Sequence, residues 1–358
     1  MHVGLVVYDE LHRETGGYRY DRQLMAHLER AGDRVDVIRL PCRSYARAAI
    51  DGLDPRMYSR LREPYNVLVE DQLCHPSLWR TRRPDIPVVS LVHLLRSGPH
   101  CGRSRPIVSR LERAYFERVD AIVATSADTA SRVASMVDLP SIVAPPAGRA
   151  EGPRVDAASV RQAARDEPFS IVYIGSVVPR KGLHTLCDAV SMLDGDFELT
   201  VVGSIETDPT YVRRLRRRID AAPWSDRVRI LGRVSDDRLE AVLADAHVLA
   251  VPSRYESVGM VYLEAMEWGT VPIATAVGGA DEFVTHGHDG LVVEPDAPVA
   301  LASHLARLAT DRDRLADLGT AALETAASRP GWDDSMASIR AFLQELVAEQ
   351  PTGAVVDP

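Results

Sequence analysis

Two glutamates, Glu256 and Glu264, are the first residues of this chain whose type and spacing suggest chemistry. A strand-like run ends at Pro252, and Ser257 can cap a helix that begins near Val258. Glu256 then stands just before the helix, and Glu264 lies about 9 Å along it at 1.5 Å per residue. Carboxylates accept hydrogen bonds from sugar and ribose hydroxyls, and the free amides of a helix start attract phosphate. The alternative is a helix-terminal charge followed by a surface glutamate.

A second candidate is the loop Gly175-Ser176-Val177-Val178-Pro179-Arg180-Lys181-Gly182, which follows a strand-like run ending at Ile174. It places two adjacent cations between glycines at the start of a helix, where backbone amides and fixed charges would meet a diphosphate. The loop is not a P-loop, because no Gly-Lys-Ser/Thr sequence ends it. A solvated turn with surface cations is the alternative.

Lysine usage points to the same loop. The chain has 42 lysine and arginine residues, and Lys181 is the single lysine among them. A compact ammonium and a planar guanidinium are not interchangeable, so Lys181 is a candidate for a position where arginine does not serve. Chance placement is the other explanation. A third loop, Gly278-Gly279-Ala280-Asp281-Glu282, opens with a glycine pair that allows close approach to a ligand, but such pairs are common.

The elements that must position these loops alternate between strands and helices, which predicts α/β domains with parallel sheets. The chain length suits two domains of about 150–200 residues. We expect domains over 1–150 and 151–331, with a linker at 144–168. Predicted strands are His2–Tyr8, Val35–Leu40, Val67–Glu70, Val88–His93, Ala121–Thr125, Ile171–Gly175, Phe197–Gly203, Val228–Gly232, Val248–Pro252 and Val271–Ala276. Ligands are expected beyond the carboxyl ends of these strands, in a cleft between two facing doubly wound, Rossmann-like domains.

Composition narrows the class of protein. The net charge of −9 argues against a general nucleic-acid binder. No apolar run reaches the roughly 20 residues of a bilayer span, and the first residues read as a strand rather than a signal peptide. Four widely spaced cysteines indicate reduced thiols. We therefore expect a cytoplasmic enzyme.

Charge is unevenly distributed, because residues 41–118 hold fourteen arginines against eight acidic residues. This basic stretch suggests an acceptor-binding surface that meets an anionic lipid-linked acceptor or contacts the inner face of a membrane peripherally. A solvated arginine face paired with acidic neighbours is the alternative. The residues concerned are Arg43, Arg47, Arg56, Arg60 and Arg62, with Asp51, Asp54 and Glu63 as the neighbours.

The combination of these motifs resembles the retaining glycosyltransferases of the GT-B architecture, in particular family four, the Glu-x7-Glu type. The likeness covers roughly residues 168–330 in order and spacing, and it is looser in the first half, through Gly16-Gly17, His93 and Ala124-Thr125-Ser126. Trp332 and the helix after it resemble the family's C-terminal segment, which rejoins the first domain, so the segment 332–350 is expected there. The motifs are Gly175–Gly182, Val201-Val202-Gly203, Leu231-Gly232-Arg233-Val234, Pro252-Ser253, Glu256 with Glu264, Ala276-Val277-Gly278-Gly279, and His288-Asp289-Gly290-Leu291-Val292.

The resemblance implies a role for each matching residue. Lys181 would bind the donor diphosphate, Glu264 the ribose hydroxyls and Glu256 the transferred sugar, with His93 facing the reacting sugar unless it is a structural histidine. The chain departs from the family at Ser176, where an arginine is common, and Arg180 is the replacement cation. The remaining donor-binding candidates are Gly16, Gly17, Gly175, Arg233, Val234 and the backbone of Val258, Gly259, Met260 and Val261.

The expected activity is transfer of a hexose-type sugar from a UDP- or GDP-sugar to a hydroxyl acceptor, which is a glycan, a lipid-linked molecule or a small molecule. The resemblance implies retention of anomeric configuration. Protein cations, rather than a metal, would stabilise the leaving diphosphate, so no metal and no cofactor are expected. The alternatives are a nucleotide-sugar epimerase of the same architecture and a non-catalytic protein that binds nucleotide sugars.

Overall fold

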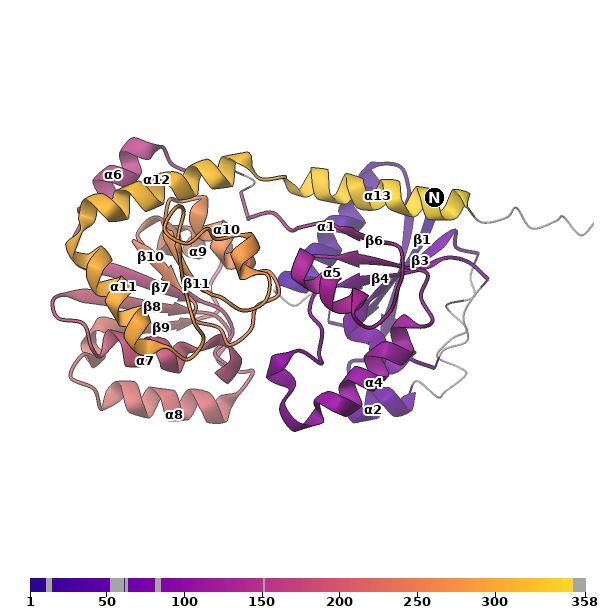
Figure 1. The fold of residues 1–358 in the computed structure, drawn as a ribbon, viewed down its shortest axis with the longest axis horizontal. Helices are drawn as coiled ribbons and strands as arrows, with labels where there is room; N and C mark the ends of the chain where they lie inside the picture. The colour runs from indigo at the N-terminus through magenta and orange to yellow at the C-terminus, as the bar shows by residue number, and fades with distance from the viewer. Residues whose placement is uncertain (11–14, 52–60, 62–63, 81–84, 151, 350–358) are drawn as a thin grey trace, which may run out of the picture. The chain divides into compact units, whose positions relative to one another are not determined.

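The chain forms two compact units, which the computed structural model describes at residues 1–10, 15–51, 61, 64–80, 85–150 and 152–349 (Figure 1). The first unit comprises Met1–Pro146 together with Trp332–Pro358, and the second comprises Ala147–Gly331. The expected boundary at residue 150 lies four residues later. Arg56, Arg60, Arg62, Asp54 and Glu63 lie outside the described residues.

The first unit is built on a parallel six-stranded sheet in the order β2-β1-β3-β4-β5-β6. Its strands are β1 (His2–Tyr8), β2 (Arg34–Leu40), β3 (Val67–Asp71), β4 (Val88–Val92), β5 (Ala121–Ala124) and β6 (Ser141–Val143). Its helices are α1 (Gly16–Arg30), α2 (Tyr45–Asp51), α3 (His75–Leu78), α4 (Arg105–Phe116), α5 (Ala127–Ala134) and α13 (Trp332–Ala348), with 3-10 turns η2 (Gln72–Cys74) and η3 (Pro99–Ser104). The central strands are buried on both faces because helices cover the sheet.

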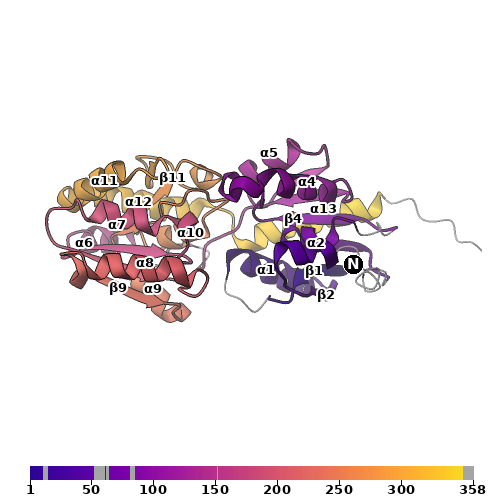
Figure 2. The same ribbon diagram turned by 90° about the horizontal axis from the view of Figure 1, so that it is seen from below.

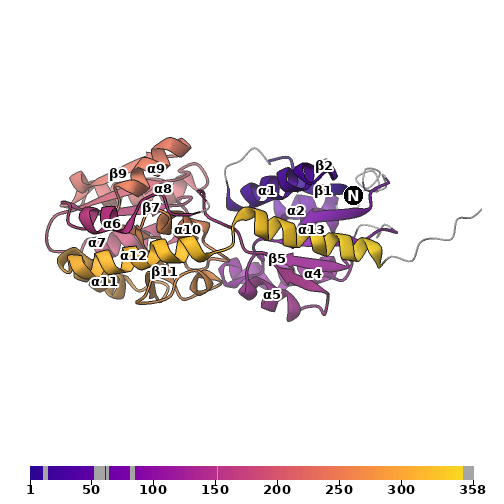
Figure 3. The ribbon, with the colours of Figure 1, turned by 90° about the horizontal axis from the view of Figure 1, so that it is seen from above.

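The helix α13, from the far end of the chain, lies along α1 (Figure 3). Its first residue, Trp332, is buried and meets the Tyr20 ring edge-on, with the ring centroids 5.5 Å apart. Arg340 Nε donates to Asp33 Oδ2 at 2.6 Å, and Ser335 Oγ donates to the Pro145 carbonyl at 2.6 Å. This helix is therefore an integral part of the first unit.

The second unit repeats the plan with a parallel sheet in the order β12-β11-β10-β7-β8-β9. Its strands are β7 (Phe169–Ile174), β8 (Phe197–Val202), β9 (Val228–Gly232), β10 (Val248–Ala250), β11 (Val271–Thr275) and β12 (Leu291–Val293). Its helices are α6 (Ala157–Ala163), α7 (Leu183–Val190), α8 (Pro209–Asp220), α9 (Asp236–Ala244), α10 (Met260–Met266), α11 (Pro298–Thr310) and α12 (Arg312–Ser328), with 3-10 turns η4 (Pro179–Lys181), η5 (Ser225–Arg227) and η6 (Ala280–Glu282). The α/β class and the parallel sheets expected from the sequence are confirmed.

Helices lie on both faces of the second sheet. Figure 2 shows α7 and α8 on one face, and α11 packs against α7. On the other face α12 packs against both α6 and α10. The expectation of a plain linker at 144–168 is wrong in part, because α6 forms within it and buries Val160 against Gly269 and Gly319.

The structure differs from the sequence predictions at the start of α10 and at one edge of each sheet. Ser257 does not cap the helix that follows it, because the N-cap is Gly259 in a left-handed conformation (φ +78°) and α10 begins at Met260. Each sheet also gains a three-residue edge strand, β6 and β12, that the sequence pattern did not predict. No helix in the described ranges has both the length and the apolar content needed to cross a membrane.

Chain order reverses in each sheet between neighbouring strands, at β1 and β3 in the first and at β7 and β10 in the second. Ligands of open α/β sheets bind beyond the carboxyl ends of the strands at such switch points. In the second unit, the loops that follow β7 and β10 carry Lys181 and Glu256, respectively. The topology therefore brings the two strongest sequence candidates to one place.

Candidate functional site

Lys181 and Glu256 form an ion pair in which the lysine ammonium contacts the Glu256 carboxylate. The side chains are 14% and 11% exposed, so the pair is sheltered but open to solvent at one side. Arg180 Nη1 lies 3.8 Å from the same carboxylate and donates to the Tyr255 carbonyl at 2.6 Å. Two cations thus converge on one carboxylate at the switch point of the second sheet.

Electrostatics keep Glu256 ionised. Burial alone would raise the pKa of this carboxyl, but the charges of Lys181 and Arg180 outweigh burial and hold the pKa below its usual value. Ser253 Oγ adds a hydrogen bond to Glu256 Oε2 at 3.3 Å. Because the carboxylate is charged, the net charge of these three ionic side chains is +1, which suits an anionic ligand better than a cation.

Two glycines make the approach of these loops possible. Gly182 has φ +70°, and a Cβ there would lie 1.9 Å from the Pro252 carbonyl oxygen, so only glycine lets the β7 loop pack on the β10 loop. Gly278, the first of the glycine pair after β11, has φ +88° and would place a Cβ 1.9 Å from the Glu256 carbonyl oxygen. The third loop named in the sequence therefore supports the backbone of Glu256, and Gly279 N donates to that carbonyl at 3.0 Å.

The other residues of the β7 loop surround the lysine stem. Gly175 lies beside the Lys181 side chain, whose Cδ and Cε would be 3.7 Å from a Cβ at that position. Ser176 is partly buried, and its carbonyl accepts a hydrogen bond from Tyr173 Oη at 3.2 Å. Arg180 rather than Ser176 therefore supplies the second cation next to Glu256.

The segment 258–261 leads into α10 on the same side of the sheet. Val258 is buried, Gly259 is the N-cap without a side-chain cap, and Met260 and Val261 form the first turn. The amides of such a turn point along the helix axis toward its start and carry partial positive charge. They lie beyond Glu256, and their contribution to binding an anion stays a prediction.

Glu264 lies on α10 with 4% of its surface exposed, which excludes a simple surface glutamate. Arg149 Nη2 is 3.6 Å from its Oε1, and Arg149 Nη1 reaches Asp236 at 2.5 Å. The sequence did not single out Arg149, because it stands in the stretch interpreted as a linker. Arg233, by contrast, is exposed and follows the edge strand β9 with the partly buried Val234, two strands away from β7.

Two pockets border this region of the second unit. A pocket of about 300 Å³ is lined by Pro179 of the β7 loop and by His184, Tyr211, Arg214, Leu215, Arg218 and Arg254. Arg254 is paired with Asp296 at 2.8 Å and Arg218 contacts Asp188, so two of its three arginines have acidic partners.

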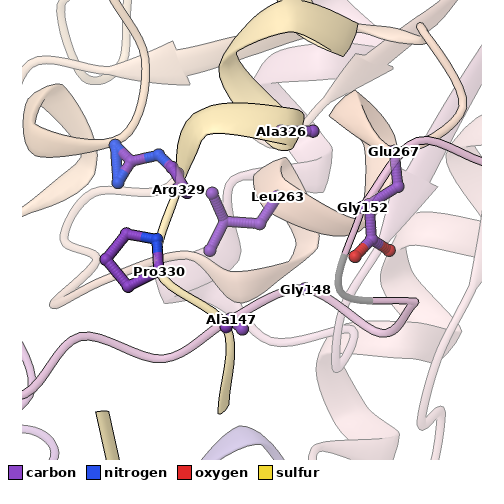
Figure 4. Close-up of a pocket in the computed structure, with 9 residues that line it drawn as sticks. Ala147, Gly148, Gly152, Leu263, Glu267, Ala326, Arg329 and Pro330 are labelled. Carbon is purple, nitrogen blue, oxygen red and sulfur yellow. The ribbon is translucent and has the colours of Figure 1, made fainter. Parts of the chain in front are cut away.

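The second pocket is small and lies where residues 147–150 pass α10 and α12 (Figure 4). Glu267 points into it and accepts from the amides of Arg149 at 3.0 Å and Ala150 at 2.9 Å. Gly148 leaves room for this carboxylate, because a Cβ there would lie 2.2 Å from Glu267 Oε1. Glu267 therefore anchors the chain segment that enters the second unit. Its carboxylate is already engaged by these backbone amides.

In the first unit, His93 follows β4 and is 9% exposed. Gly17, near the start of α1, lies against its ring, since a Cβ on Gly17 would be 3.3 Å from His93 Cδ2. Tyr20 meets the same ring edge-on at 5.2 Å between centroids. Gly16 is exposed at the first position of α1. The predicted trio of Gly16, Gly17 and His93 is thus brought together at the carboxyl ends of β1 and β4.

Two acidic residues that the sequence did not single out complete this cluster. Asp21 Oδ1 lies 2.9 Å from His93 Nε2, and Asp71, at the end of β3, offers a further carboxylate. Donor atoms of Asp21, Asp71 and His93 all lie within 4.8 Å of one another, and among the described residues this is the one such group close enough to hold a metal ion. The Asp21–His93 distance is that of a hydrogen bond, so we describe the group as a hydrogen-bonded cluster.

Glu112 holds the loop that follows His93. This buried carboxylate accepts from the amides of Arg96 at 2.6 Å and Ser97 at 3.1 Å, and from Gln72 Nε2 at 2.8 Å. Gln72 directly follows Asp71, so one side chain of α4 ties the end of β3 to the end of β4. Such shared hydrogen bonds restrict the motion of both loops.

Comparison with known proteins bears on the second unit most directly. Residues 155–325 match the family model described as Glycosyl transferases group 1. A D-inositol 3-phosphate glycosyltransferase from Xylanimonas cellulosilytica is 34% identical over 186 residues, which are 52% of this chain and 44% of that protein. A GDP-mannose-dependent alpha-(1-6)-phosphatidylinositol monomannoside mannosyltransferase from Mycobacterium tuberculosis is 31% identical over 264 residues, 67% of this chain and 65% of that protein. The chain thus spans about half to two thirds of the length of these relatives.

Solved structures extend the likeness to the whole fold. Sucrose-phosphate synthase from Thermosynechococcus elongatus superposes with a TM-score of 0.83 at 22% identity, over 97% of this chain and 99% of that chain. HepE from Anabaena, solved in complex with UDP-glucose, superposes with a TM-score of 0.73 at 19% identity, over 96% of this chain and 100% of that chain. The chain therefore has the two-sheet fold of the GT-B glycosyltransferases, and residues 155–325 are its match to the group 1 glycosyl transferases.

Proposed function

We propose that this protein is a retaining glycosyltransferase that moves a hexose from a nucleoside diphosphate sugar to a hydroxyl acceptor. The observation that carries the proposal is the meeting of Lys181, Arg180 and Glu256 at the switch point of the second sheet, within the segment that matches the group 1 family. The names of relatives support a sugar nucleotide as donor, since one is GDP-mannose-dependent and a protein of the same fold binds UDP-glucose. The donor is accordingly a UDP- or GDP-hexose.

The chemistry follows from the charges. Cleavage of the bond between sugar and phosphate leaves an oxocarbenium-like sugar and a diphosphate whose negative charge grows in the transition state. Lys181, Arg180 and the amides at the start of α10 are fixed before the reaction, and preorganised charges of this kind stabilise a developing anion. The incoming diphosphate takes over Lys181 as its partner, which frees the Glu256 carboxylate to accept hydrogen bonds from sugar hydroxyls.

The remaining roles follow the positions of the side chains. Glu264 is buried along α10 and binds the ribose hydroxyls, with Arg149 beside it as a partner in the free protein. Gly17 and His93 belong to the first unit, the proposed acceptor-binding unit, and keep the roles that the resemblance implies for them. Gly175, Ser176, Val258, Gly259, Met260 and Val261 line the diphosphate, and Arg233 with Val234 packs near the base. No metal is required for this arrangement, because protein cations neutralise the leaving group.

A contact between the first unit and an anionic membrane surface is a further part of the proposal. Arg43 and Arg47 both reach Asp51, at 3.1 Å and 3.8 Å, which favours a solvated arginine face. Ile50 on α2 and Ile107 on α4 are 62% and 69% exposed, which favours a surface that inserts apolar side chains.

A donor panel tests the main proposal. Purified protein is incubated with UDP-, GDP- and ADP-hexoses, and binding is measured by thermal shift while slow hydrolysis releases free nucleotide. We expect one nucleotide to raise the melting temperature and its sugar conjugate to be hydrolysed, with Lys181→Ala as the matched inactive control. Transfer with retention is then checked by the anomeric configuration of the product formed on a hydroxyl acceptor. Binding of no sugar nucleotide would contradict the proposal, and conversion of the sugar without transfer would favour an epimerase.

A further inference from the structure

Three buried polar side chains of the first unit, Asp21, Asp71 and His93, form a cluster that the sequence motifs do not explain. Their exposed fractions are 0%, 1% and 9%. They come from α1, the end of β3 and the residue after β4, and the hydrogen bond between His93 Nε2 and Asp21 Oδ1 is 2.9 Å long. The loops of both strands are held by Glu112, so the cluster is rigidly placed.

The cluster has an imbalance of charge. Asp21 Oδ2 and Asp71 Oδ2 are buried and have no hydrogen-bond partner among the described residues, while His93 is the one basic group in contact with the carboxylates. Burying a second, uncompensated carboxylate is costly, and the cheapest remedy is for one of the two acids to keep its proton. Asp71 is the better candidate, because Asp21 already has the imidazole as partner while Asp71 Oδ1 accepts only from the Leu73 amide at 2.9 Å.

The surroundings agree with this assignment. Burial and then the charge of Asp21 raise the pKa of Asp71 to about 7. Burial lowers the pKa of His93, but the charge and hydrogen bond of Asp21, with the charge of Asp71, outweigh burial and raise it. The other titratable groups that face the cluster are Tyr8, Tyr18, Tyr20 and Cys74, whose pKa values are raised chiefly by burial, so they stay uncharged near neutral pH.

We propose that Asp21 and Asp71 are positioning residues for His93. Asp71 carries a proton and is the neutral member of the cluster, while Asp21 keeps its charge and fixes His93 Nε2. The ring is then protonated on both nitrogens and presents Nδ1–H to an oxygen of the ligand. This inference rests on the proposed function only for the identity of that ligand, which is the transferred sugar or the phosphate leaving it.

Loss of the proton from Asp71 changes the cluster. Below about pH 7 the charges of Asp21 and His93 cancel, and the cluster is neutral. Above that pH the Asp71 proton passes to solvent, and the cluster becomes net negative. A net negative cluster attracts an electron-rich ligand oxygen less than a neutral one does, so turnover falls as the pH rises through this range.

Nitrogen-15 NMR of the histidine rings in the full chain tests the cluster without any donor. We expect both His93 nitrogens to be protonated at pH 7.5, and Asp21→Asn to abolish this state. Asp71→Asn retains the oxygen that accepts from Leu73, and it should leave the ring charged while removing the step in its shifts near pH 7. The matched control is Asp36→Asn, whose carboxylate bonds His2 Nε2 at 2.8 Å at the surface; it should move only His2.

A neutral His93 ring in the wild-type protein at pH 7.5 would overturn the inference, and this measurement does not depend on whether Asp21→Asn folds. Stoichiometric binding of Zn²⁺ or Mn²⁺ alone, with loss of the Asp21 bond, would also overturn it and make the cluster a cation site. With an active donor, Asp21→Asn should lower kcat by about ten- to a hundredfold while donor affinity changes little. Asp71→Asn should remove the fall in kcat above pH 7. If no donor is turned over, the NMR result still decides the inference, and only the proposed function fails.

Discussion

Lys181, the single lysine of the chain, contacts the carboxylate of Glu256 across two loops that are adjacent only because β7 and β10 are neighbours in the sheet. The two residues are 75 positions apart in sequence. Under the proposed roles of Lys181 and Glu256, the free protein pairs its diphosphate-binding cation with its sugar-binding carboxylate. Binding of a donor must therefore exchange one partner for another.

Replacement of Lys181 tests this exchange. We expect Lys181→Ala to lower kcat by about 10²–10³, as for loss of one electrostatic donor at an active site. Lys181→Arg should also be impaired, because a planar guanidinium does not reproduce the compact ammonium that contacts Glu256. Steady-state kinetics with the active donor measure both. Full activity of Lys181→Arg would show that the lone lysine is accidental.

Replacement of Glu256 and replacement of Glu264 should have different effects on nucleotide affinity and turnover. Glu264→Ala removes the proposed ribose acceptor and leaves Arg149 on Asp236, so nucleotide affinity should weaken while kcat changes less. Glu256→Ala should lower turnover and blur sugar specificity with nearly unchanged affinity for free nucleotide. Calorimetric titration of both variants with nucleotide provides the comparison. Equal losses of affinity would mean that the division of labour is wrong.

Lowering the pH should reduce the stability of the second unit, because Glu256 becomes protonated. Because cations hold the folded pKa of this carboxyl below its unfolded value, the folded state binds fewer protons near pH 4. Its contribution to stability is then complete above about pH 5 and is lost as pH falls through the folded pKa. Urea unfolding at a series of pH values should show a steeper loss for the wild type than for Glu256→Gln. Parallel curves would exclude Glu256 as a source of the pH dependence.

A buried ion pair should matter for the stability of the first unit. Arg118 holds Glu70 with two hydrogen bonds of 2.7 Å and 3.2 Å, and Glu70 is fully buried. Arg118→Met leaves that charge alone and should cost about 3–5 kcal/mol, and addition of Glu70→Gln should recover part of the loss. On α4, which ends just before Arg118, Arg113→Met breaks only an exposed pair with Glu117 and should cost less than about 1 kcal/mol. Urea unfolding gives all three values, and equal costs for Arg118 and Arg113 would contradict the assignment.

Flotation with liposomes decides the membrane contact. If the basic and apolar surface of α2 and α4 inserts, the protein should float with vesicles in proportion to their anionic lipid content. Ile107→Asp should weaken flotation, and added salt should reduce it. Lack of binding at low salt would leave a soluble acceptor and a solvated arginine face.

Much of the fold could be predicted because buried parallel strands are short, nearly continuous apolar runs, as in Ile171–Ile174 and in Val88–Val92, where Ser90 is the one polar residue. The edge strands β6 and β12 were missed because three residues carry no readable period. Asp21 was missed because its role depends on tertiary contact with His93, yet a signal existed. It shares a helix face with Leu24 and Leu28, and an acid on an apolar face needs an explanation.

The site in the second unit also depends on tertiary contacts that the sequence does not reveal. Glu256, Glu264 and Lys181 could be recognised as parts of motifs, because the spacing within each motif is local in the sequence. The contact between Lys181 and Glu256 could not be predicted, because it depends on which strands are neighbours in the sheet. Arg149 was not predicted as a site residue, because nothing in the sequence near it indicates that Glu267 binds its backbone and holds it next to α10.

The first unit is made from both ends of the chain, and this has a consequence for biosynthesis. A ribosome completes the contiguous second unit before it has made α13, so the first unit waits for its last helix while the second can already fold. Until then Tyr20 and Asp33 lack Trp332 and Arg340, and their apolar and charged surfaces stay uncovered. Released chains that end at Gly331 should accordingly be protected from protease over 155–325 and cleaved within 1–146.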